Sequence, residues 1–410
     1  MIDYLIKQAN LFINESDIKR EMDVAIKDGK IADVGKQLEY DVENPQNIIQ
    51  GKGKLLSPAF YDVHMHIDES FTMDNDDTLS ILAAIDNQEK SNLKYFDYSD
   101  DDLLEMMLKN SSRVVEMCIK NGTTLIKTNV LFTPAWKTIA LEAMMILRKK
   151  YSKHCVIQTS CGFPLLFEKD LDNAAKKGEI DFVSGYPYMD ETYWLTIDHI
   201  FNKAKQFDLP IDIHCGEADV PDISSFEYFL DKTEKENMQG KVSCGHLTAL
   251  SAIGIDEKRA NAAIERAGAI NLNVVTLTSC NLYLMSSNRR GPTRVRELMD
   301  AGANISICSD NIRDTFRPYG NCNLLEEALL TAKVHKFCSR KELRQVFSMI
   351  TYNSAKNALV SDYGLSTGCK ADLVLLDAAT PEEAILDNAA KLNVWKDGKM
   401  IARDGNIIWQ

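Results

Sequence analysis

The stretch "SPAFYDVHMHIDESF", residues 57–71, is the point from which both the fold and the site follow. An apolar run leads into His64 and His66, which are separated by one residue. Side chains two positions apart in a strand lie on the same face, so both imidazoles can point into one interior. In a chain with seven histidines such a pair also arises by chance, so the pair alone is weak evidence of a metal site.

Seven further β-branched runs follow at a regular spacing. They are "TLIKTNV" (124–130), "VIQTSC" (156–161), "FVSG" (182–185), "PIDIHC" (210–215), "KVSCGH" (241–246), "INLNVV" (270–275) and "NISICSD" (304–310). Their ends recur about every 30 residues, with amphipathic helical segments between them, as in repeated βα units. Eight such units predict an α/β fold of the (β/α)8 TIM-barrel type. The long first connection, 67–123, is predicted to form a lid over the barrel mouth.

Both ends of the chain carry β-hairpin signals. Asp28-Gly29 separates two β-like runs near the start, and Asp397-Gly398 and Asp404-Gly405 do so near the end. Similar material at both termini predicts one small sheet outside the main core. The predicted domains are a composite β-sandwich, residues 1–57 with 361–410, and a metal-dependent barrel, residues 58–360.

Composition argues against several partners and locations. The net charge of −13 opposes binding to nucleic acid or to an anionic membrane surface. Apolar runs stay shorter than the roughly 18 residues of a membrane span, and the first residues lack the pattern of a signal peptide. The ten cysteines are scattered without a CxxC pair, as expected of reduced core thiols. We therefore expect a cytoplasmic protein whose partner is a small molecule.

The ends of the predicted strands carry the residues of chemical interest. Active sites of (β/α)8 barrels lie at the carboxyl ends of the strands. His64 and His66 end the first strand, and His214, His246 and Asp310 end the fifth, sixth and eighth. This nitrogen-rich set with one carboxylate suits one divalent ion, and zinc, iron and manganese all tolerate it. Water bound to such an ion is hydroxide near neutral pH and can attack an electrophilic carbon.

Glu217 adds a proton-transfer group to this set. It lies three residues after His214, just past a strand end, where a carboxyl group can carry a proton to a leaving nitrogen. Taken singly, His246 could be a hydrogen-bonded structural residue, Asp310 a helix cap and Glu217 a solvated acid. Their joint placement at the strand ends of one barrel favours the metal site. The sequence contains no HExxH, P-loop or GxSxG motif that would indicate another chemistry.

Five stretches carry a resemblance to a known family: "SPAFYDVHMHIDESF", "DIHCGEAD", "VSCGHLTAL", "RRGPTRVRELMDAGANISICSDNIRDTFRPYGN" and "YGLSTGCKADLVLLDA". In these the chain resembles the amidohydrolase superfamily, within the branch of bacterial cytosine deaminase and N-isopropylammelide isopropylaminohydrolase. The resemblance implies a (β/α)8 barrel with a β-sandwich built from both termini, and a homo-oligomer. It also implies one metal ion, because the predicted fourth strand, "DFVSGYP", lacks the lysine that bridges two ions in many relatives.

The resemblance also implies roles for single residues. His64, His66, His214 and Asp310 correspond to the metal ligands; Glu217 corresponds to the acid/base, and His246 to the residue that orients the water or polarises the substrate. The implied reaction is cytosine deaminase-like, removal of an amino or alkylamino group from a small N-heterocycle by metal-bound hydroxide. Hydrolysis of a cyclic amide or N-acyl bond is the alternative within the fold, and a non-catalytic barrel scaffold is the alternative outside it.

Departures from the family pattern concern the substrate. Both relatives have glutamine in a Phe-x-Gln context after the third strand, where this chain has Leu165 or its neighbour Pro164. Losing that amide leaves polar edges of cytosine unpaired at about 1–3 kcal/mol per buried group, so cytosine is not the expected substrate. Core packing of Phe316 and surface ion pairing of Arg289 are as compatible with the sequence as substrate binding. The candidate substrate contacts are Lys127, Asn129, Leu165, Asn311, Phe316 and Arg289.

Overall fold

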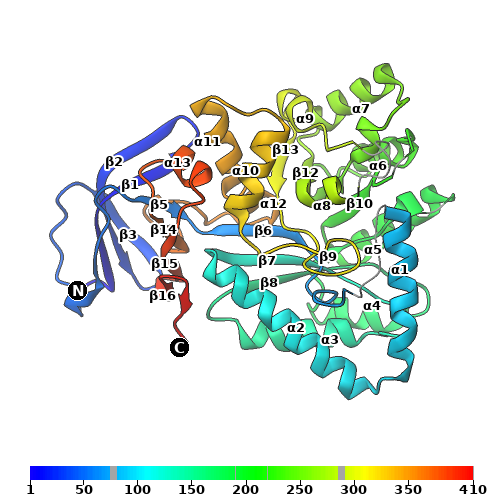
Figure 1. The fold of residues 1–410 in the computed structure, drawn as a ribbon, viewed down its shortest axis with the longest axis horizontal. Helices are drawn as coiled ribbons and strands as arrows, with labels where there is room; N and C mark the ends of the chain where they lie inside the picture. The colour runs from blue at the N-terminus through cyan, green and yellow to red at the C-terminus, as the bar shows by residue number, and fades with distance from the viewer. Residues whose placement is uncertain (74–80, 190, 219, 285–290, 410) are drawn as a thin grey trace.

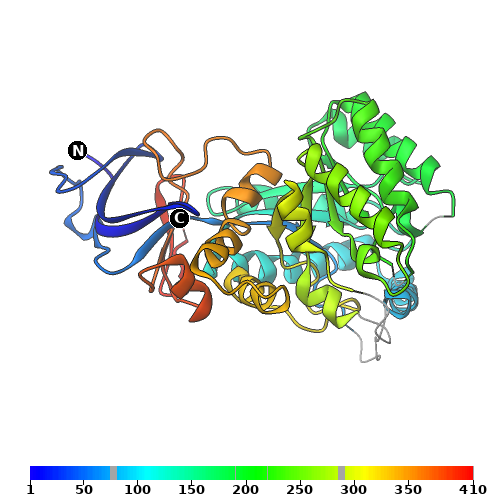
Figure 2. The ribbon, with the colours of Figure 1, turned by 90° about the horizontal axis from the view of Figure 1, so that it is seen from above.

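The computed structural model contains two sheets, and it describes residues 1–73, 81–189, 191–218, 220–284 and 291–409 (Figure 1). One sheet is a parallel barrel and the other is built from the two ends of the chain. In Figures 1 and 2 the terminal sheet lies on the left and the barrel with its helices on the right. Among the described residues, no helix has both the length and the apolar composition needed to cross a bilayer.

The barrel confirms the eight predicted strands. Its strands are β6 (Phe60–Met65), β7 (Thr123–Val130), β8 (Val156–Cys161), β9 (Phe182–Val183), β10 (Ile211–Cys215), β11 (Val242–His246), β12 (Asn273–Thr276) and β13 (Asn304–Ile307). They pair in chain order and in parallel from β6 to β13. A bridge between Met65 and Asp310 joins the last strand to the first, and the Asp310 N–H donates to the His64 carbonyl at 3.0 Å. Closure of the barrel therefore places Asp310 beside the two histidines of β6.

Helices surround this barrel, and their bounds in chain order follow. They are α1 (Ile81–Lys94), α2 (Asp100–Lys120), α3 (Ile139–Lys150), α4 (Glu168–Lys176), α5 (Tyr193–Phe207), α6 (Ser224–Lys235), α7 (Glu257–Ala269), α8 (Thr278–Tyr283), α9 (Val295–Ala301), α10 (Leu324–Val334), α11 (Arg340–Ser348), α12 (Tyr352–Asn357) and α13 (Pro381–Leu386). Local signals set their ends. For example, Ser99 and Asp102 form a capping box that starts α2, and Gly302 at φ 108° ends α9.

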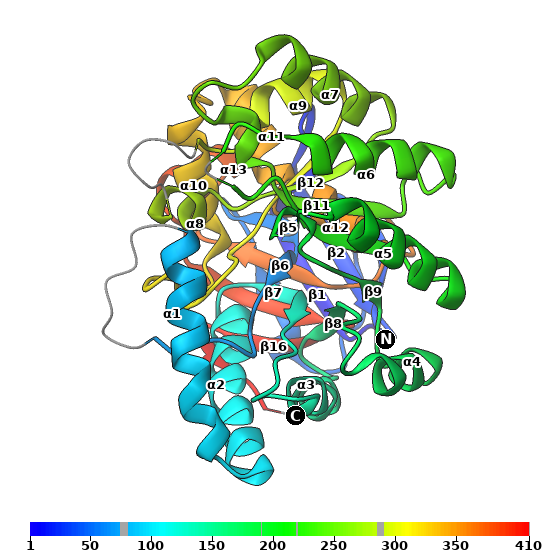
Figure 3. The same cartoon turned by 90° about the vertical axis from the view of Figure 1, so that its right-hand side faces the viewer.

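The predicted lid is correct only in part. Helix α2 packs its buried apolar residues against β7 and α3, as an ordinary barrel helix does, so that half of the prediction was wrong. Helix α1 instead lies at one side of the barrel mouth, on the end of the barrel that faces the viewer in Figure 3. Residues 74–80 of the predicted lid lie outside the described residues.

The terminal sheet joins the first and last segments of the chain. It contains β1 (Tyr4–Asn14), β2 (Asp17–Lys27), β3 (Lys30–Gly35), β4 (Ile48–Gln50), β5 (Leu55–Pro58), β14 (Leu373–Leu376), β15 (Lys391–Lys396), β16 (Lys399–Arg403) and β17 (Asn406–Ile407). The two halves meet where β5 pairs antiparallel with β14. This arrangement confirms the prediction of a separate β unit formed by both termini.

Tight turns let the sheet curve around its own core. At the Asp28-Gly29 and Asp397-Gly398 turns both residues have positive φ, as the predicted hairpins require. The two turns touch, since a Cβ added to Gly398 would come within 2.8 Å of the Gly29 Cα. The enclosed core includes Ile26 and Trp395, one from each end of the chain. The chain passes to the barrel at Ala59, and we propose the domain division at 57/58 and 360/361 on this basis.

Candidate active site

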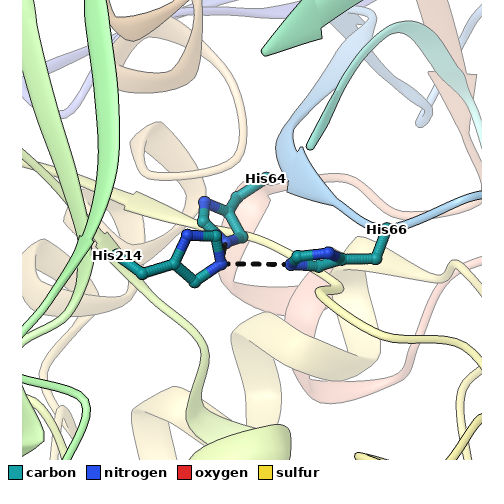
Figure 4. A group of neighbouring side chains, drawn as sticks. All are labelled: His64, His66 and His214. Atoms are coloured by element: carbon teal, nitrogen blue, oxygen red, sulfur yellow. Dashed lines mark hydrogen bonds between the residues drawn. The ribbon is translucent and has the colours of Figure 1, made fainter. Parts of the chain in front are cut away.

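Three imidazoles meet at the carboxyl end of the barrel. His64 and His66 come from the end of β6, and His214 comes from β10 (Figure 4). The His214 Nε2 atom lies 3.1 Å from the Nε2 atoms of both His64 and His66. All three side chains are buried. Alternation along β6 produces this geometry, because residues 64 and 66 share the inward face of the strand.

Hydrogen bonds cannot account for this cluster. A ring nitrogen carries either one proton or one lone pair, so the His214 Nε2 cannot satisfy both neighbours. The Asp310 carboxylate is also left without hydrogen bonds, since within the described residues neither of its oxygens has a hydrogen-bond partner. Its Oδ1 lies 3.9 Å from the His64 Nε2 and 3.6 Å from the His66 Nε2. Buried polar groups of this kind require a partner. Three nitrogen donors and one carboxylate around one point fit a divalent cation.

The protonation states of His64 and His214 also favour a cation site. Burial, reinforced by the neighbouring imidazoles, holds the pKa of His64 and His214 well below the usual value, so both present lone pairs. Burial also acts to lower the pKa of His66, but Glu69 and the nearby aspartates outweigh it and raise that pKa to about 10. The His66 Nδ1 lies 2.9 Å from Glu69 Oε2. A protonated imidazole carries hydrogen on both ring nitrogens, so a bound cation would displace the Nε2 proton of His66 while the Nδ1 proton stays directed at Glu69.

Glu69 connects this cluster to helix α1, which lies beside the barrel mouth. The Gln88 side chain of α1 donates to Glu69 Oε1, so the two carboxylate oxygens contact one ligand histidine and one helix. The sequence contained a signal for this role, since Glu69 directly follows the His-x-His-x-Asp motif. Sequence reasoning did not assign Glu69 a role.

His246 and Glu217 lie side by side next to the cluster. The His246 Nδ1 lies 3.1 Å from Asn281 Oδ1 and 3.4 Å from Glu217 Oε1. Asn281, in α8, donates from its amide nitrogen to Thr293 Oγ1 at 3.4 Å, which orients its carbonyl oxygen toward His246. A proton on Nδ1 then leaves the buried His246 Nε2 as an acceptor. Sequence reasoning missed Asn281, because a polar residue in a short helix carries no distinctive pattern.

A cavity of about 720 Å³ opens above these residues. Its lining includes His66, His214, Glu217, His246 and Asp310, together with three candidate substrate contacts, Leu165, Asn311 and Phe316. Asn129 is buried outside this lining and accepts a hydrogen bond from Ser184 Oγ at 2.8 Å. Arg289 lies outside the described residues. The structure thus brings together the predicted ligand and acid/base residues and half of the predicted substrate contacts.

Lys127 does not reach the cavity. It is fully buried inside the barrel, where its Nζ donates to Asn357 Oδ1 at 2.8 Å and lies 3.3 Å from Asp212 Oδ1. Burial lowers the pKa of Lys127, although the Asp212 carboxylate opposes this shift. The proposal of Lys127 as a substrate contact was wrong, because residue 127 faces the barrel interior well before the end of β7.

We expect Lys127→Met to destabilise the protein by about 3–5 kcal/mol, because Asp212 would remain buried without its cation. Urea unfolding followed by circular dichroism measures this change in the free energy of unfolding. The double variant Lys127→Met/Asp212→Leu removes both charges and should recover most of the loss. An equally large loss in both proteins would mean that packing, and not the ion pair, sets the cost.

Comparison with known proteins places this geometry in a family. The model of the family described as "Amidohydrolase family" matches residues 164–402. The chain is 27% identical to N-isopropylammelide isopropyl amidohydrolase of Pseudomonas sp. (strain ADP), over 97% of each chain. It is 25% identical to pterin deaminase of Rhizobium rhizogenes, over 84% of this chain and 80% of that protein. The structure of 5-methylcytosine deaminase from Klebsiella pneumoniae liganded with 5-fluorocytosine covers 97% of both chains at a TM-score of 0.86 and 22% identity.

Proposed function

Because the chain belongs to the amidohydrolase family, we propose that it is a metal-dependent hydrolase that removes an amino or alkylamino group from a small N-heterocycle. One observation carries the proposal: three imidazole nitrogens converge, on the floor of a cavity large enough for a ring substrate, with a carboxylate that has no hydrogen-bond partner among the described residues. The named activities of the two curated relatives, an ammelide amidohydrolase and a pterin deaminase, support the substrate class.

Four side chains would hold the metal, namely His64, His66, His214 and Asp310. The donor set suits one divalent ion, zinc or iron, with manganese also compatible. When bound, such an ion supplies a water acidified to near-neutral pKa as the nucleophile. Glu69 fixes the ring of His66 through Nδ1, which keeps the Nε2 atom directed at the ion.

The remaining steps are proton transfers by residues of this chain. Asp310 and the His246 Nε2 receive the proton that the attacking water loses. Glu217, whose Oε1 lies 3.4 Å from the His246 Nδ1, takes up the two protons of the water in turn through these groups. It gives the first to a ring nitrogen and the second to the departing amine, whose bond to the ring carbon breaks as the carbonyl forms. Asn281 keeps the His246 acceptor nitrogen oriented into the site. Burial of all these groups excludes bulk water from the transfers.

The cellular setting is also a proposal. We propose a cytoplasmic location, supported by the eight cysteines that are buried as free thiols. The homo-oligomer and the absence of a nucleic-acid partner, both expected from the sequence, stay predictions.

The test of this function is a substrate screen. Metal-reconstituted protein is incubated with amino-substituted pyrimidines, triazines, pterins and imidazolones, and released ammonia or alkylamine is measured with the ring product. We expect amine release with the ring intact for at least one class, and no release after chelation of the metal. Ring opening without amine release would instead identify a cyclic amide hydrolase, and release that survives chelation would contradict the metal-dependent reaction.

A further inference from the structure

The cavity above the metal ligands has two unlike walls. Helix α1 contributes one apolar residue, Ile85, and three polar ones, Gln88, Glu89 and Asn92. The other wall is mainly apolar, with Tyr188, Thr196 and His199 as polar members. It comes from the loop after β8, from the 3-10 helix η3 (Pro187–Met189) and from the start of α5. In Figure 3, α1 and α5 lie on opposite sides of the barrel mouth. The polar groups of α1 and the apolar side chains opposite therefore contact different sides of a molecule that fills this cavity.

Three side chains of the apolar wall are strongly exposed. Leu165 is 83% exposed, Met189 is 53% exposed and Leu195 is 59% exposed, although all three line the cavity. They form the rim, since the metal-binding histidines on the floor are buried. Exposed apolar groups clustered at a functional cavity mark a binding surface, because covering them is favourable in proportion to the area removed from water.

The size of the cavity also indicates a ligand larger than a bare ring. At about 720 Å³ it lies within the range of roughly 300–1,000 Å³ that encloses drug-sized ligands. A bare six-membered ring placed at the floor would leave the rim uncovered. The described part of the lining contains carboxylates, such as Glu89, but neither lysine nor arginine. The group that reaches the rim is therefore better uncharged than anionic.

We propose that the substrate is an amino-substituted N-heterocycle that carries an uncharged alkyl or aryl substituent on the ring, distant from the leaving amine. The reacting carbon lies at the floor, the polar edge of the ring faces α1, and the substituent covers Leu165, Met189 and Leu195. This inference rests on the proposed function and deepens it, because it specifies a substituent that the product retains. It also gives a role to Leu165, which lines the cavity.

The experiment compares matched substrates and matched variants. For the ring class hydrolysed in the screen, kcat/KM is measured for the parent compound, for its butyl or benzyl derivative and for the corresponding carboxyalkyl derivative. We expect the alkyl or aryl derivative to exceed both others by about tenfold or more. Leu165→Gln and Leu195→Gln should bring the ratio of alkylated to parent kcat/KM toward one, mainly through KM. Leu166→Gln is the control, because Leu166 is 68% exposed and adjacent to Leu165 but does not line the cavity; it should keep the ratio.

Several results would overturn the inference. One is a preference for the parent or the carboxyalkyl compound; another is an unchanged ratio in Leu165→Gln and Leu195→Gln. The oligomeric state of each variant is measured by light scattering, since the same residues could pack against a second copy of the chain. Dissociation of an oligomer without a change in the ratio would assign the rim to a subunit interface. If no heterocycle is hydrolysed at all, the proposed function itself fails, and this outcome is distinct from hydrolysis with the wrong preference.

Discussion

His214→Ala is expected to lose both the bound divalent ion and the hydrolytic activity. The His214 Nε2 is the only one of the three nitrogens that lies within 3.1 Å of both others, so its removal opens the centre of the ligand set. Without the ion, the pKa of the reacting water returns from near neutrality toward its much higher value in bulk water, which lowers the available hydroxide by several orders of magnitude. The rate of amine release should fall by a comparable factor.

This prediction is tested by measuring the metal content after dialysis together with the rate of amine release. His154→Ala is the matched control, because His154 is also buried but lies near the C-terminus, where its Nε2 contacts the Ile408 carbonyl. It should retain the ion and the activity. A His214→Ala protein that keeps a full complement of metal and normal turnover would show that the cation binds elsewhere.

Much of the ligand set could be predicted because it depends on strand geometry alone. The alternation of side chains fixes His64 and His66 on one face, and parallel strands in a closed barrel bring their carboxyl ends together. His214 lies within the last two residues of β10, and Asp310 lies three residues past β13, so both needed only to be recognised as close to strand ends. The hairpin turns at Asp28-Gly29 and Asp397-Gly398 were equally predictable, because few residue pairs tolerate positive φ at two successive positions.

The depth at which an inward-facing side chain lies in the barrel could not be predicted from strand geometry. Lys127 and Asn129 both belong to β7, and alternation allows both to point inward. Only the structure shows that Lys127 lies near Asp212 and Asn357, on a layer below the cavity. The hydrogen bond between Gln88 and Glu69 could not be predicted from the sequence either, because it depends on where α1 packs after a long connection. Tertiary packing, and not local pattern, decides such contacts.

Glu217→Gln is expected to reduce kcat by about 10²- to 10⁴-fold while the metal stays bound. Glu217 is 4% exposed and lies beside His246, outside the three imidazoles that converge on one point. Glutamine preserves the size of the side chain and one carbonyl oxygen, but it cannot gain and release a proton at the working pH. The leaving amine then departs without an internal proton donor, which slows the chemical step and not substrate binding.

Steady-state kinetics with metal analysis separates this effect from a structural one. Glu191→Gln is the control, since Glu191 is an exposed carboxylate close to α5 that does not line the cavity, and it should leave kcat unchanged. A loss of metal in Glu217→Gln would make Glu217 a ligand, and a rise in KM at constant kcat would make it a binding group. Only a fall in kcat at full metal content identifies Glu217 as the group that carries the proton, because the nucleophile is then still present and only its partner in proton transfer has changed.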